Sequence, residues 1–440
     1  MKYYCIGIKG SGMSTLANIL HDLGNEVTGY DDSKHYKFTE EGLNKRNIKI
    51  FYEPHEIDKD TIVTYSKAFS IDHPEIKRVK ELGLKIMDYN QVVGEVTKMF
   101  ETVGVCGTHG KTTTSLLISH IIKNVLGCSY FVGDGTGYAN KNDKIFVIES
   151  DEYNKHFLAY YPHVAVITNI ELDHTECYPG GIEEIKDTFK IFGNKAELIV
   201  ACGDDKNIRD IKFDKKTILY GFNENNDVIA KNVKLTDNGS AFDVYINNEL
   251  YGHFEIPLFG KHMILNALSA IIVCNHYGIE KEDILKYMKT FQGAKRRFKE
   301  RVYNDIVVID DYAHHPTEIK VTLEAARQKY PNKKIIAIHL PNTYSRTEAL
   351  MDDFIDVLKL ADKTFVMDIY SDREKEEDYP GVTSDTIIEA IPNAEKVSVE
   401  TVDKLLKYKN AVMCFMSCGN IYIILEKYEN LLKEQQKVAN

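Results

Sequence analysis

One segment of the chain combines glycines, a lysine and hydroxyl side chains at a spacing that suits phosphate binding. It reads Gly107-Thr108-His109-Gly110-Lys111-Thr112-Thr113 and lies between an apolar stretch and a helical pattern. Glycines allow backbone N–H groups to turn towards phosphate oxygens, and the start of the following helix adds positive potential. Lys111 would bridge the β- and γ-phosphates of a nucleotide, and the Thr112 hydroxyl would bind magnesium. Val105 stands where the strict motif has glycine, so the match is to a shortened form, G-T-x-G-K-T, which favours ATP binding over a simple glycine-rich turn.

Two clusters of polar residues follow apolar segments further along the chain. Glu149-Ser150-Asp151-Glu152 comes after residues 146–148, and Asn169-Ile170-Glu171-Leu172-Asp173-His174 comes after residues 164–168. Ligands of open parallel sheets bind outside the carboxyl ends of the strands, so we expect both clusters near the phosphate loop. A carboxylate such as that of Glu149 suits magnesium, whereas the imidazole of His174 is an unusual magnesium ligand because it prefers softer metals. Each cluster alone would fit a solvated turn; their order on one sheet favours a metal site.

A glycine-rich turn near the start of the chain is a third candidate site. It reads Gly7-Ile8-Lys9-Gly10-Ser11-Gly12-Met13-Ser14, and Asp31 follows the next predicted strand. In a dinucleotide-binding fold an acidic residue at this place binds the ribose. With Gly10 and Gly12 in register, however, the third glycine position holds Thr15, so the match to a dehydrogenase is weak. A nicotinamide cofactor would also leave the phosphate loop unexplained.

Three segments, each beginning with an apolar strand, must position these residues. Strands are expected at residues 3–8 and 26–29 in the first, 102–106, 144–148 and 164–168 in the second, and 306–309, 334–338, 364–367 and 411–415 in the third. Strands that alternate with helices predict an α/β fold with mostly parallel sheets. We place three domains at residues 1–95, 96–297 and 298–440, and we expect the tail after Leu431 to be frayed.

Composition narrows the class of partner. A chain of 440 residues is long enough for several domains, and its net charge of −11 argues against nucleic acid or an anionic membrane as a partner. The first residues carry no secretory signal, and no apolar run reaches the roughly 18 residues of a membrane span. The eight cysteines include no CxxC pair, which is typical of reduced thiols in a cytoplasmic protein.

The motifs, taken in order, resemble those of the Mur ligase family. The matching residues are Gly107 to Thr114, Glu149 to Glu152, Asn169 to His174, Asn266-Ala267, Arg296-Arg297-Phe298 and Asp310-Asp311-Tyr312-Ala313-His314-His315-Pro316. The resemblance implies three domains: a Rossmann-like domain for a uridine nucleotide, a central P-loop ATPase-like domain and a C-terminal Rossmann-like α/β domain. It also implies an activity that depends on ATP and Mg²⁺. L-alanine, or a similar small amino acid, would be joined to UDP-N-acetylmuramate through an acyl phosphate in peptidoglycan precursor synthesis.

The resemblance also assigns roles to residues. Thr112, Glu149 and His174 resemble the metal site, Asn266 resembles an adenine contact, and Arg297 resembles an arginine that reaches the ATP phosphates. Tyr312 and His314 resemble residues of the amino-acid site, and Arg346 resembles an arginine that meets the amino acid or the phosphates. Lys111, His174, Arg297, His314 and Arg346 would thus be catalytic. The nucleotide-sugar contacts implied in the first domain are Gly10, Ser11, Gly12, Met13, Ser14, Asp31 and, at another strand end, Ser66.

Some positions depart from the family pattern. Met263 replaces a common asparagine near Asn266, Asn342 replaces a usual histidine, and Ser417-Cys418 replaces a frequent Gly-Ala pair. The last two changes lie in the domain expected to receive the amino acid, so they bear on its identity more than on the type of reaction. Two alternatives therefore stay open: a recycling ligase that attaches a preformed murein peptide to the same sugar nucleotide, and a non-catalytic paralogue. A monomer and a homodimer fit the sequence equally well.

Overall fold

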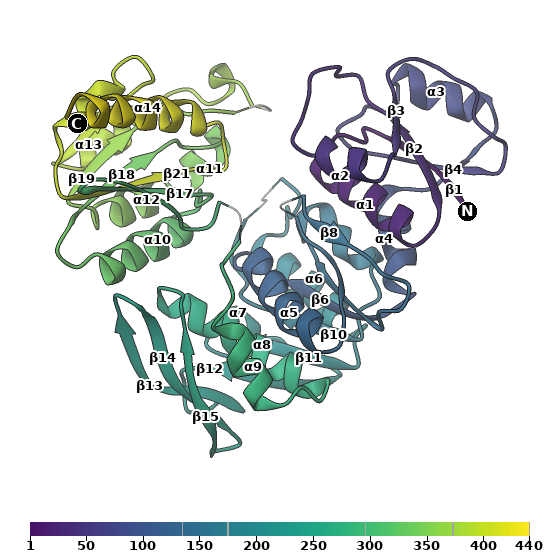
Figure 1. Ribbon diagram of the computed structural model, residues 1–440, viewed down its shortest axis with the longest axis horizontal. Coiled ribbons are helices and arrows are strands. Elements are labelled where there is room, and N and C mark those ends of the chain that lie inside the picture. The colour runs from purple at the N-terminus through teal and green to yellow at the C-terminus, as the bar shows by residue number, and fades with distance from the viewer. Residues whose placement is uncertain (134, 174–175, 295, 372–373, 440) are drawn as a thin grey trace. The chain divides into compact units, whose positions relative to one another are not determined.

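The computed structural model describes residues 1–133, 135–173, 176–294, 296–371 and 374–439, and these residues form three β-sheets (Figure 1). Two compact units hold the sheets. The first unit comprises Met1–Asn232, Phe242–Phe254 and Leu265–Phe291, and the second comprises Val233–Ala241, Glu255–Ile264 and Gln292–Asn440. The predicted α/β class with mostly parallel sheets is confirmed. The predicted domain boundaries near residues 95 and 298 fall between sheets and stay predictions.

The first sheet has five strands in the order β3-β2-β1-β4-β5, and every neighbouring pair is parallel. The strands are β1 Lys2–Ile6, β2 Glu26–Tyr30, β3 Lys49–Phe51, β4 Thr61–Tyr65 and β5 Lys85–Ile86. The helices are α1 Ser11–Asp22, α2 Glu40–Lys45, α3 Pro74–Glu81 and α4 Tyr89–Thr97. The strand order reverses between β1 and β4, which is the place where open α/β sheets bind ligands.

The second sheet has ten strands in the order β15-β14-β13-β12-β11-β10-β6-β9-β7-β8. Its strands are β6 Glu101–Cys106, β7 Ser129–Phe131, β8 Gly137–Tyr138, β9 Ile145–Glu149, β10 Val164–Ile167, β11 Leu198–Cys202, β12 Lys216–Gly221, β13 Val228–Thr236, β14 Gly239–Ile246 and β15 Glu249–Ile256. The central strands β6, β9 and β10 are parallel and almost fully buried, and they confirm the three strands predicted here. Asn247 and Asn248, both at positive φ, form the tight turn between β14 and β15.

Six helical segments of the described residues lie between the strands of the second sheet or between that sheet and the third. They are α5 Lys111–Val125, the 3₁₀ segment η1 Tyr153–Ala159, α6 Gly181–Gly193, α7 Lys206–Arg209, α8 Lys261–His276 and α9 Lys281–Met288. α5 begins directly after the phosphate loop, so its first turn presents backbone N–H groups to that loop.

The third sheet has six strands in the order β16-β17-β21-β18-β19-β20, of which β16 is antiparallel to β17 and the others are parallel. The strands are β16 Lys299–Tyr303, β17 Ile306–Asp311, β18 Lys334–His339, β19 Lys363–Val366, β20 Ala394–Lys396 and β21 Ala411–Met416. The helical segments are α10 Pro316–Lys329, α11 Tyr344–Ala349, α12 Met351–Leu358, η2 Glu376–Asp378, α13 Ser384–Ala390, η3 Val402–Lys407 and α14 Tyr422–Ala439. All four predicted strands are confirmed, within two residues at each end.

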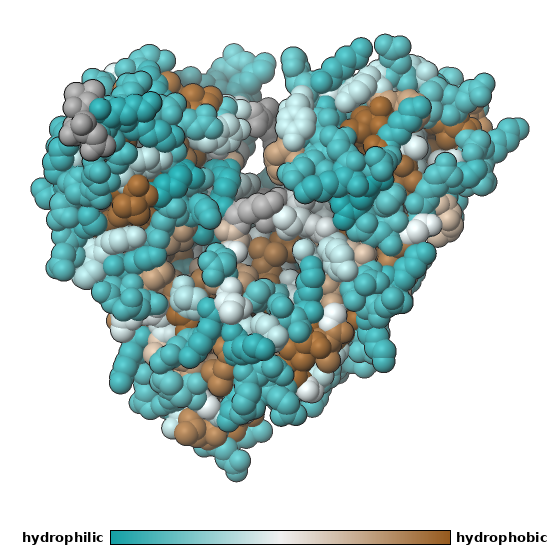
Figure 2. Space-filling view, in the orientation of Figure 1, coloured by the Kyte–Doolittle hydropathy of each residue, from teal (hydrophilic) through white to brown (hydrophobic). Residues whose placement is uncertain are grey.

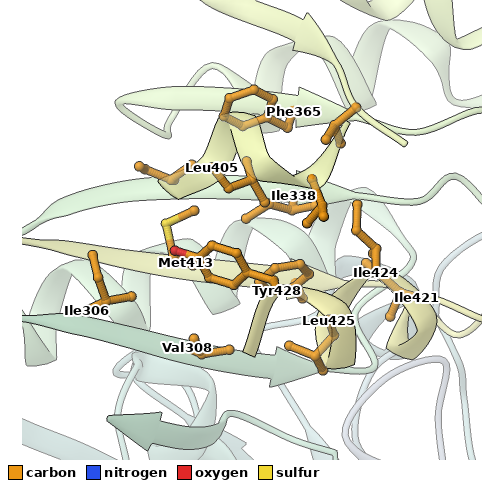
Figure 3. Close-up of a cluster of buried hydrophobic side chains, with 14 of the residues drawn as sticks. Ile306, Val308, Ile338, Phe365, Leu405, Met413, Ile421, Ile424, Leu425 and Tyr428 are labelled. Carbon is orange, nitrogen blue, oxygen red and sulfur yellow. The ribbon is translucent and has the colours of Figure 1, made fainter. Parts of the chain in front are cut away.

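Both faces of this sheet are packed. β21 alternates between two clusters of buried residues, with Met413 and Phe415 in one and Val412 and Cys414 in the other. Figure 3 shows Tyr428 of α14 lying beside Met413, on the face of the sheet that carries Met413 and Phe415. The expectation of a frayed tail after Leu431 was wrong, because the helix continues to Ala439.

Hydrophilic residues cover most of the face drawn in Figure 2, and its hydrophobic residues lie in separate patches. None of the helices in the described residues combines the length and hydrophobicity that a membrane span requires.

Candidate active site

The phosphate loop connects β6 to α5, and two of its positions suit glycine alone. Gly107 has φ of 137°, and a Cβ built on it would lie 2.0 Å from Thr168 Oγ1. Gly110, the N-cap of α5, has φ of 82°, in the left-handed region. The loop therefore has the backbone path that the glycine pattern predicted, with the N-terminus of a 15-residue helix behind it.

The loop after β10 braces the phosphate loop. The His109 N–H donates to Asn169 Oδ1 at 2.7 Å, and Asn169 Nδ2 donates to the carbonyl of the same histidine at 2.9 Å. Thr168 Oγ1 also donates to that carbonyl, at 2.6 Å, and Thr108 N–H donates to the Asn169 carbonyl at 3.1 Å. The predicted meeting of these two loops is therefore confirmed at Asn169. The predicted metal residue His174 lies outside the described residues.

Lys111 is held by acceptors on two sides. Its Nζ donates to the carbonyls of Gly107 at 2.7 Å and Thr108 at 3.3 Å, and it forms an ion pair with Glu152 at 2.8 Å. Burial by itself would lower the pKa of Lys111, but the charges of Glu152 and Asp151 raise it above its usual value. Burial raises the pKa of Glu152 to about 7, which the lysine opposes only in part. The ammonium is thus charged and already placed at the mouth of the phosphate loop.

Thr112 and Glu149 form an adjacent pair of oxygen ligands. The Thr112 hydroxyl donates to Glu149 Oε1 at 2.9 Å, and the Gly133 N–H donates to Oε2 at 2.7 Å. Burial raises the pKa of Glu149, while the Gly133 N–H and the charge of Lys111 act against this. A hydroxyl and a carboxylate are hard oxygen donors, so the two side chains fit a magnesium ion.

Asn266 lies against the start of α5. A Cβ built on Gly110 would lie 3.1 Å from Asn266 Oδ1, and the asparagine is buried. The structure therefore brings Asn266 together with Gly107, Thr108, His109, Lys111, Thr112 and Glu149. Thr113 is buried within α5, where its backbone contributes to the first turn.

The turn after β1 has a compact internal structure. The Gly10 N–H donates to the Gly7 carbonyl at 3.0 Å, and the Ser14 hydroxyl donates to the Ser11 carbonyl at 2.9 Å. Met13 and Ser14 are buried, so their side chains face the protein interior. A Cβ built on Gly12 would lie 2.7 Å from Tyr89 Oη. The small residues therefore let the backbone of the turn pass close to its neighbours.

Two more residues predicted for the nucleotide-sugar site lie beside this turn. Ser66 is adjacent to it, because a Cβ built on Gly7 would lie 3.0 Å from the Ser66 Cβ. Asp31 is buried and accepts N–H groups from Lys9 at 3.0 Å and Ser33 at 3.1 Å. Its two carboxylate oxygens thus each bind the protein backbone.

In the second unit, the carboxyl end of β17 gathers another group of predicted residues. Arg297 donates to Glu318 Oε1 at 3.3 Å, and the guanidinium lies 5.2 Å from the ring centroid of Tyr312. The rings of Tyr312 and His314 meet edge to face at 5.5 Å. Burial raises the pKa of Asp311 to about 6, although Arg297 and the N–H groups of Ala313 and Phe298 act against this.

Arg346 lies in α11, the helix that follows β18, and β21 separates β18 from β17 in the sheet. Its Nη1 donates to the Asn342 carbonyl at 3.4 Å, and its charge lowers the pKa of Cys418, which burial nevertheless holds at about 11. Ser417 is buried and its hydroxyl accepts the Gly419 N–H at 2.9 Å. The two adjacent residues that depart from the family pattern therefore have different surroundings. Cys418 lies near Arg346, whereas the Ser417 hydroxyl accepts a hydrogen bond from its own loop.

Reasoning from the sequence did not single out three residues that organise these sites: Glu152, Asn169 and Glu318. The first two belong to strand-end clusters that the sequence marks, and nothing in those clusters indicates which member reaches the phosphate loop. Glu318 reads as the acidic residue of a helix start, and it does accept the His314 and His315 N–H groups there.

Comparisons with known proteins agree along the whole chain. Family models match residues 2–101 (Mur ligase family, catalytic domain), 105–274 (Mur ligase middle domain) and 296–415 (Mur ligase, glutamate ligase domain). The UDP-N-acetylmuramate–L-alanine ligase of Lacticaseibacillus paracasei is 43% identical over 436 residues, which cover 98% of this chain and 99% of that protein. The ligase of the same name from Lactiplantibacillus plantarum is 43% identical over 439 residues and covers 99% of both.

Solved structures share the fold. That of the UDP-N-acetylmuramate-alanine ligase MurC from Thermotoga maritima has a TM-score of 0.81 at 25% identity, covering 99% of this chain and 100% of that one. That of a murein peptide ligase from Psychrobacter arcticus has a TM-score of 0.67 at 22% identity and covers 98% of both chains. With its three domain matches and relatives of near-equal length, this chain belongs to the Mur ligase family.

Proposed function

We propose that this chain joins L-alanine to UDP-N-acetylmuramate with the energy of ATP, in peptidoglycan precursor synthesis. The observation that carries the proposal is the 43% identity, over nearly the full chain, to two ligases of that name. A carboxylate is a poor acylating agent, so ATP would first convert it to an acyl phosphate, which the amine then attacks with release of phosphate.

The phosphate loop and its neighbours would bind ATP. Lys111, already charged and held by the loop carbonyls, would move its ammonium from Glu152 to the γ-phosphate. Thr112 and Glu149 would hold magnesium, and His174 would join them as a third ligand. Bound magnesium would neutralise charge on the phosphates. Asn266, beside Gly110, would contact the adenine, and Arg297 would supply a second cation to the transferred phosphoryl group.

The residues at the ends of β17 and β18 would bind the amino acid. Arg346 offers a planar guanidinium, which suits a bidentate grip on the substrate carboxylate. His314 Nδ1 lies 3.0 Å from both the Tyr312 carbonyl and Glu318 Oε2, so in a neutral imidazole this nitrogen would carry the proton and Nε2 would have the lone pair. His314 would then orient the amine or accept its proton, with Tyr312 beside it.

The nucleotide sugar would bind at the turn after β1. Gly10, Ser11, Gly12 and the first turn of α1 would hold the diphosphate through backbone N–H groups, and Ser66 would contact the same ligand from the end of β4. Monomeric or homodimeric assembly and a cytoplasmic location remain part of the proposal.

An assay of ADP release tests the reaction. Purified protein is incubated with ATP, Mg²⁺, UDP-N-acetylmuramate and an amino acid, with each component omitted in turn. ADP release is expected only when both the muramate nucleotide and the amino acid are present. Turnover that is indifferent to both would refute the ligase assignment.

A substrate panel separates the remaining possibilities. L-alanine, glycine, L-serine and a preformed murein tripeptide are compared as amine donors at equal concentration. Preference for the tripeptide would instead identify a recycling ligase, and binding of the sugar nucleotide without any turnover would identify a non-catalytic paralogue.

A further inference from the structure

Lys9 lies in the middle of the turn Gly7-Ile8-Lys9-Gly10, where a lysine would ordinarily be read as a ligand of the diphosphate. Its side chain is instead fully buried. The ammonium donates to the carbonyls of Ser33 and His35, each at 2.7 Å, and forms an ion pair with Glu40 at 2.7 Å. An ammonium has three donors. All three are therefore used by residues that follow β2, and none is left for a phosphate.

The backbone of Lys9 is tied to the same segment. Its N–H donates to Asp31 Oδ2 at 3.0 Å, and its carbonyl accepts the Thr39 hydroxyl at 2.7 Å. Asp31 begins this segment and Thr39 lies one residue before its end, whereas the ammonium binds Ser33 and His35 in between and Glu40 at the end. Lys9 thus joins residues 31–40 to the turn through five contacts, three made by its ammonium and two by its backbone.

Residues 31–40 lie where a ligand of this sheet would be bounded. They leave the carboxyl end of β2, the strand next to β1, and the strand order reverses on the other side of β1, between β1 and β4. The segment exposes Tyr36 and Phe38, with 69% and 65% of their surface accessible. Phe38 and Ser11 both approach Gly135, since a Cβ built there would lie 3.4 Å from one and 3.5 Å from the other.

We propose that Lys9 is a positioning residue for the uridine nucleotide: it holds residues 31–40 as a fixed wall beside the diphosphate turn and does not itself contact phosphate. Asp31 serves the same purpose from the other end, by clamping the backbone of Lys9 and Ser33. The wall presents the aromatic ring of Phe38 beside Ser11, in a position to border the nucleotide. This inference rests on the proposed binding of a uridine nucleotide by the first domain.

The test compares Lys9→Met with Lys34→Met, which removes an exposed lysine of the same segment. UDP binding is measured by calorimetry, and amide hydrogen exchange is measured without nucleotide. Lys9→Met is expected to weaken UDP binding at least tenfold and to speed exchange across residues 31–40. It should raise KM for the nucleotide sugar while leaving kcat and KM for ATP within twofold. Lys34→Met should change each quantity less than twofold.

Several outcomes separate this proposal from its alternatives. Weaker UDP binding with unchanged exchange at residues 31–40 would identify Lys9 as a direct phosphate ligand and overturn the proposal. Unchanged UDP binding would overturn it as well. If Lys9→Met does not fold, Glu40→Gln replaces it, with a three- to tenfold loss expected and the same exchange pattern. Failure of the unaltered protein to bind UDP would instead refute the proposed function of the first domain.

Discussion

Replacing Glu152 by glutamine tests whether its ion pair with Lys111 competes with ATP. The pair is largely shielded from solvent: the side chain of Glu152 is 5% exposed and that of Lys111 is 13% exposed. A nucleotide must take the ammonium from this carboxylate before Lys111 can bind the γ-phosphate. Glutamine has almost the same shape but no charge, so the substitution weakens the competing contact and leaves the loop carbonyls in place.

The magnitude follows from the strength of the contact that is removed. A buried hydrogen bond to a charged group contributes about 1.5–3 kcal/mol, and we take a neutral acceptor to retain about half of it. The difference of about 0.75–1.5 kcal/mol corresponds to roughly four- to twelvefold in Kd. We therefore expect the Glu152→Gln variant to bind ATP about four- to twelvefold more tightly than the unaltered protein when magnesium is absent.

Calorimetric titration with ATP in the presence of EDTA measures this effect without the metal site. Asp151→Asn is the matched control, because Asp151 is also acidic but lies 3.8 Å from Lys111 and is 53% exposed. An exposed pair contributes about 0–1 kcal/mol, so this control should change Kd less than about threefold. Equal or weaker binding by Glu152→Gln would refute the idea that the ion pair opposes nucleotide binding.

Two further substitutions test the loop geometry and a buried histidine. Gly107→Ala should lower the free energy of unfolding by more than the roughly 1–2 kcal/mol of left-handed strain, because its Cβ would meet Thr168 Oγ1. Urea unfolding checks this against Gly278→Ala, where only strain applies, because a Cβ built there would lie more than 4 Å from every described residue other than its chain neighbours. Burial lowers the pKa of His339 to about 4 from its usual 6.5, so the unfolded chain binds more protons between these values and stability is lost as pH falls from about 6.5 towards 4. The loss of stability reaches about 2 kcal/mol at pH 5. His339→Asn keeps a donor for the Met416 carbonyl and should flatten this part of the profile of melting temperature against pH. An unchanged slope would contradict the lowered pKa of His339.

Burial on both faces allowed three strands of the second sheet to be predicted, although the equally buried β11 was not predicted. β6, β9 and β10 read as continuous apolar runs, because parallel strands covered on both sides need no polar face. β14 and β15 were not predicted. They carry polar residues at exposed positions, and a two-residue Asn247-Asn248 turn was the one strong signal of their hairpin.

The sequence predicted which residues cluster at each site but not which of them contact one another. The sequence places Glu149, Asp151 and Glu152 at one strand end, and only the path of the backbone decides which carboxylate reaches Lys111 and which reaches Thr112. That path includes Asn154 at φ of 50° just beyond the cluster. The turn after β1 shows the same limit: its sequence does not indicate that the Lys9 ammonium binds residues 33–40.

Glu318 offers a final test, because it serves the fold and the proposed chemistry at once. Its Oε2 accepts the N–H groups of His314 and His315 at the start of α10, while its Oε1 accepts from Arg297 at 3.3 Å. Glutamine can accept with one oxygen only, and its amide donates where the other oxygen accepted. If it keeps the helix cap, the guanidinium of Arg297 loses its ion pair with Glu318. We expect Glu318→Gln to lower kcat about tenfold while KM for ATP changes less than threefold, a cost of about 1.4 kcal/mol in the transition state.

Loss of the cap instead would cost about 1 kcal/mol of stability and leave Arg297 in place. Glu324→Gln, an exposed acid on the same helix, should change neither quantity measurably. A lower melting temperature with unchanged kcat would therefore mean that Glu318 only stabilises the start of the helix. A lower kcat with an unchanged melting temperature would mean that the reaction needs the contacts of Glu318 with Arg297 or with His314, whose Nδ1 lies 3.0 Å from Oε2, rather than its role at the helix start.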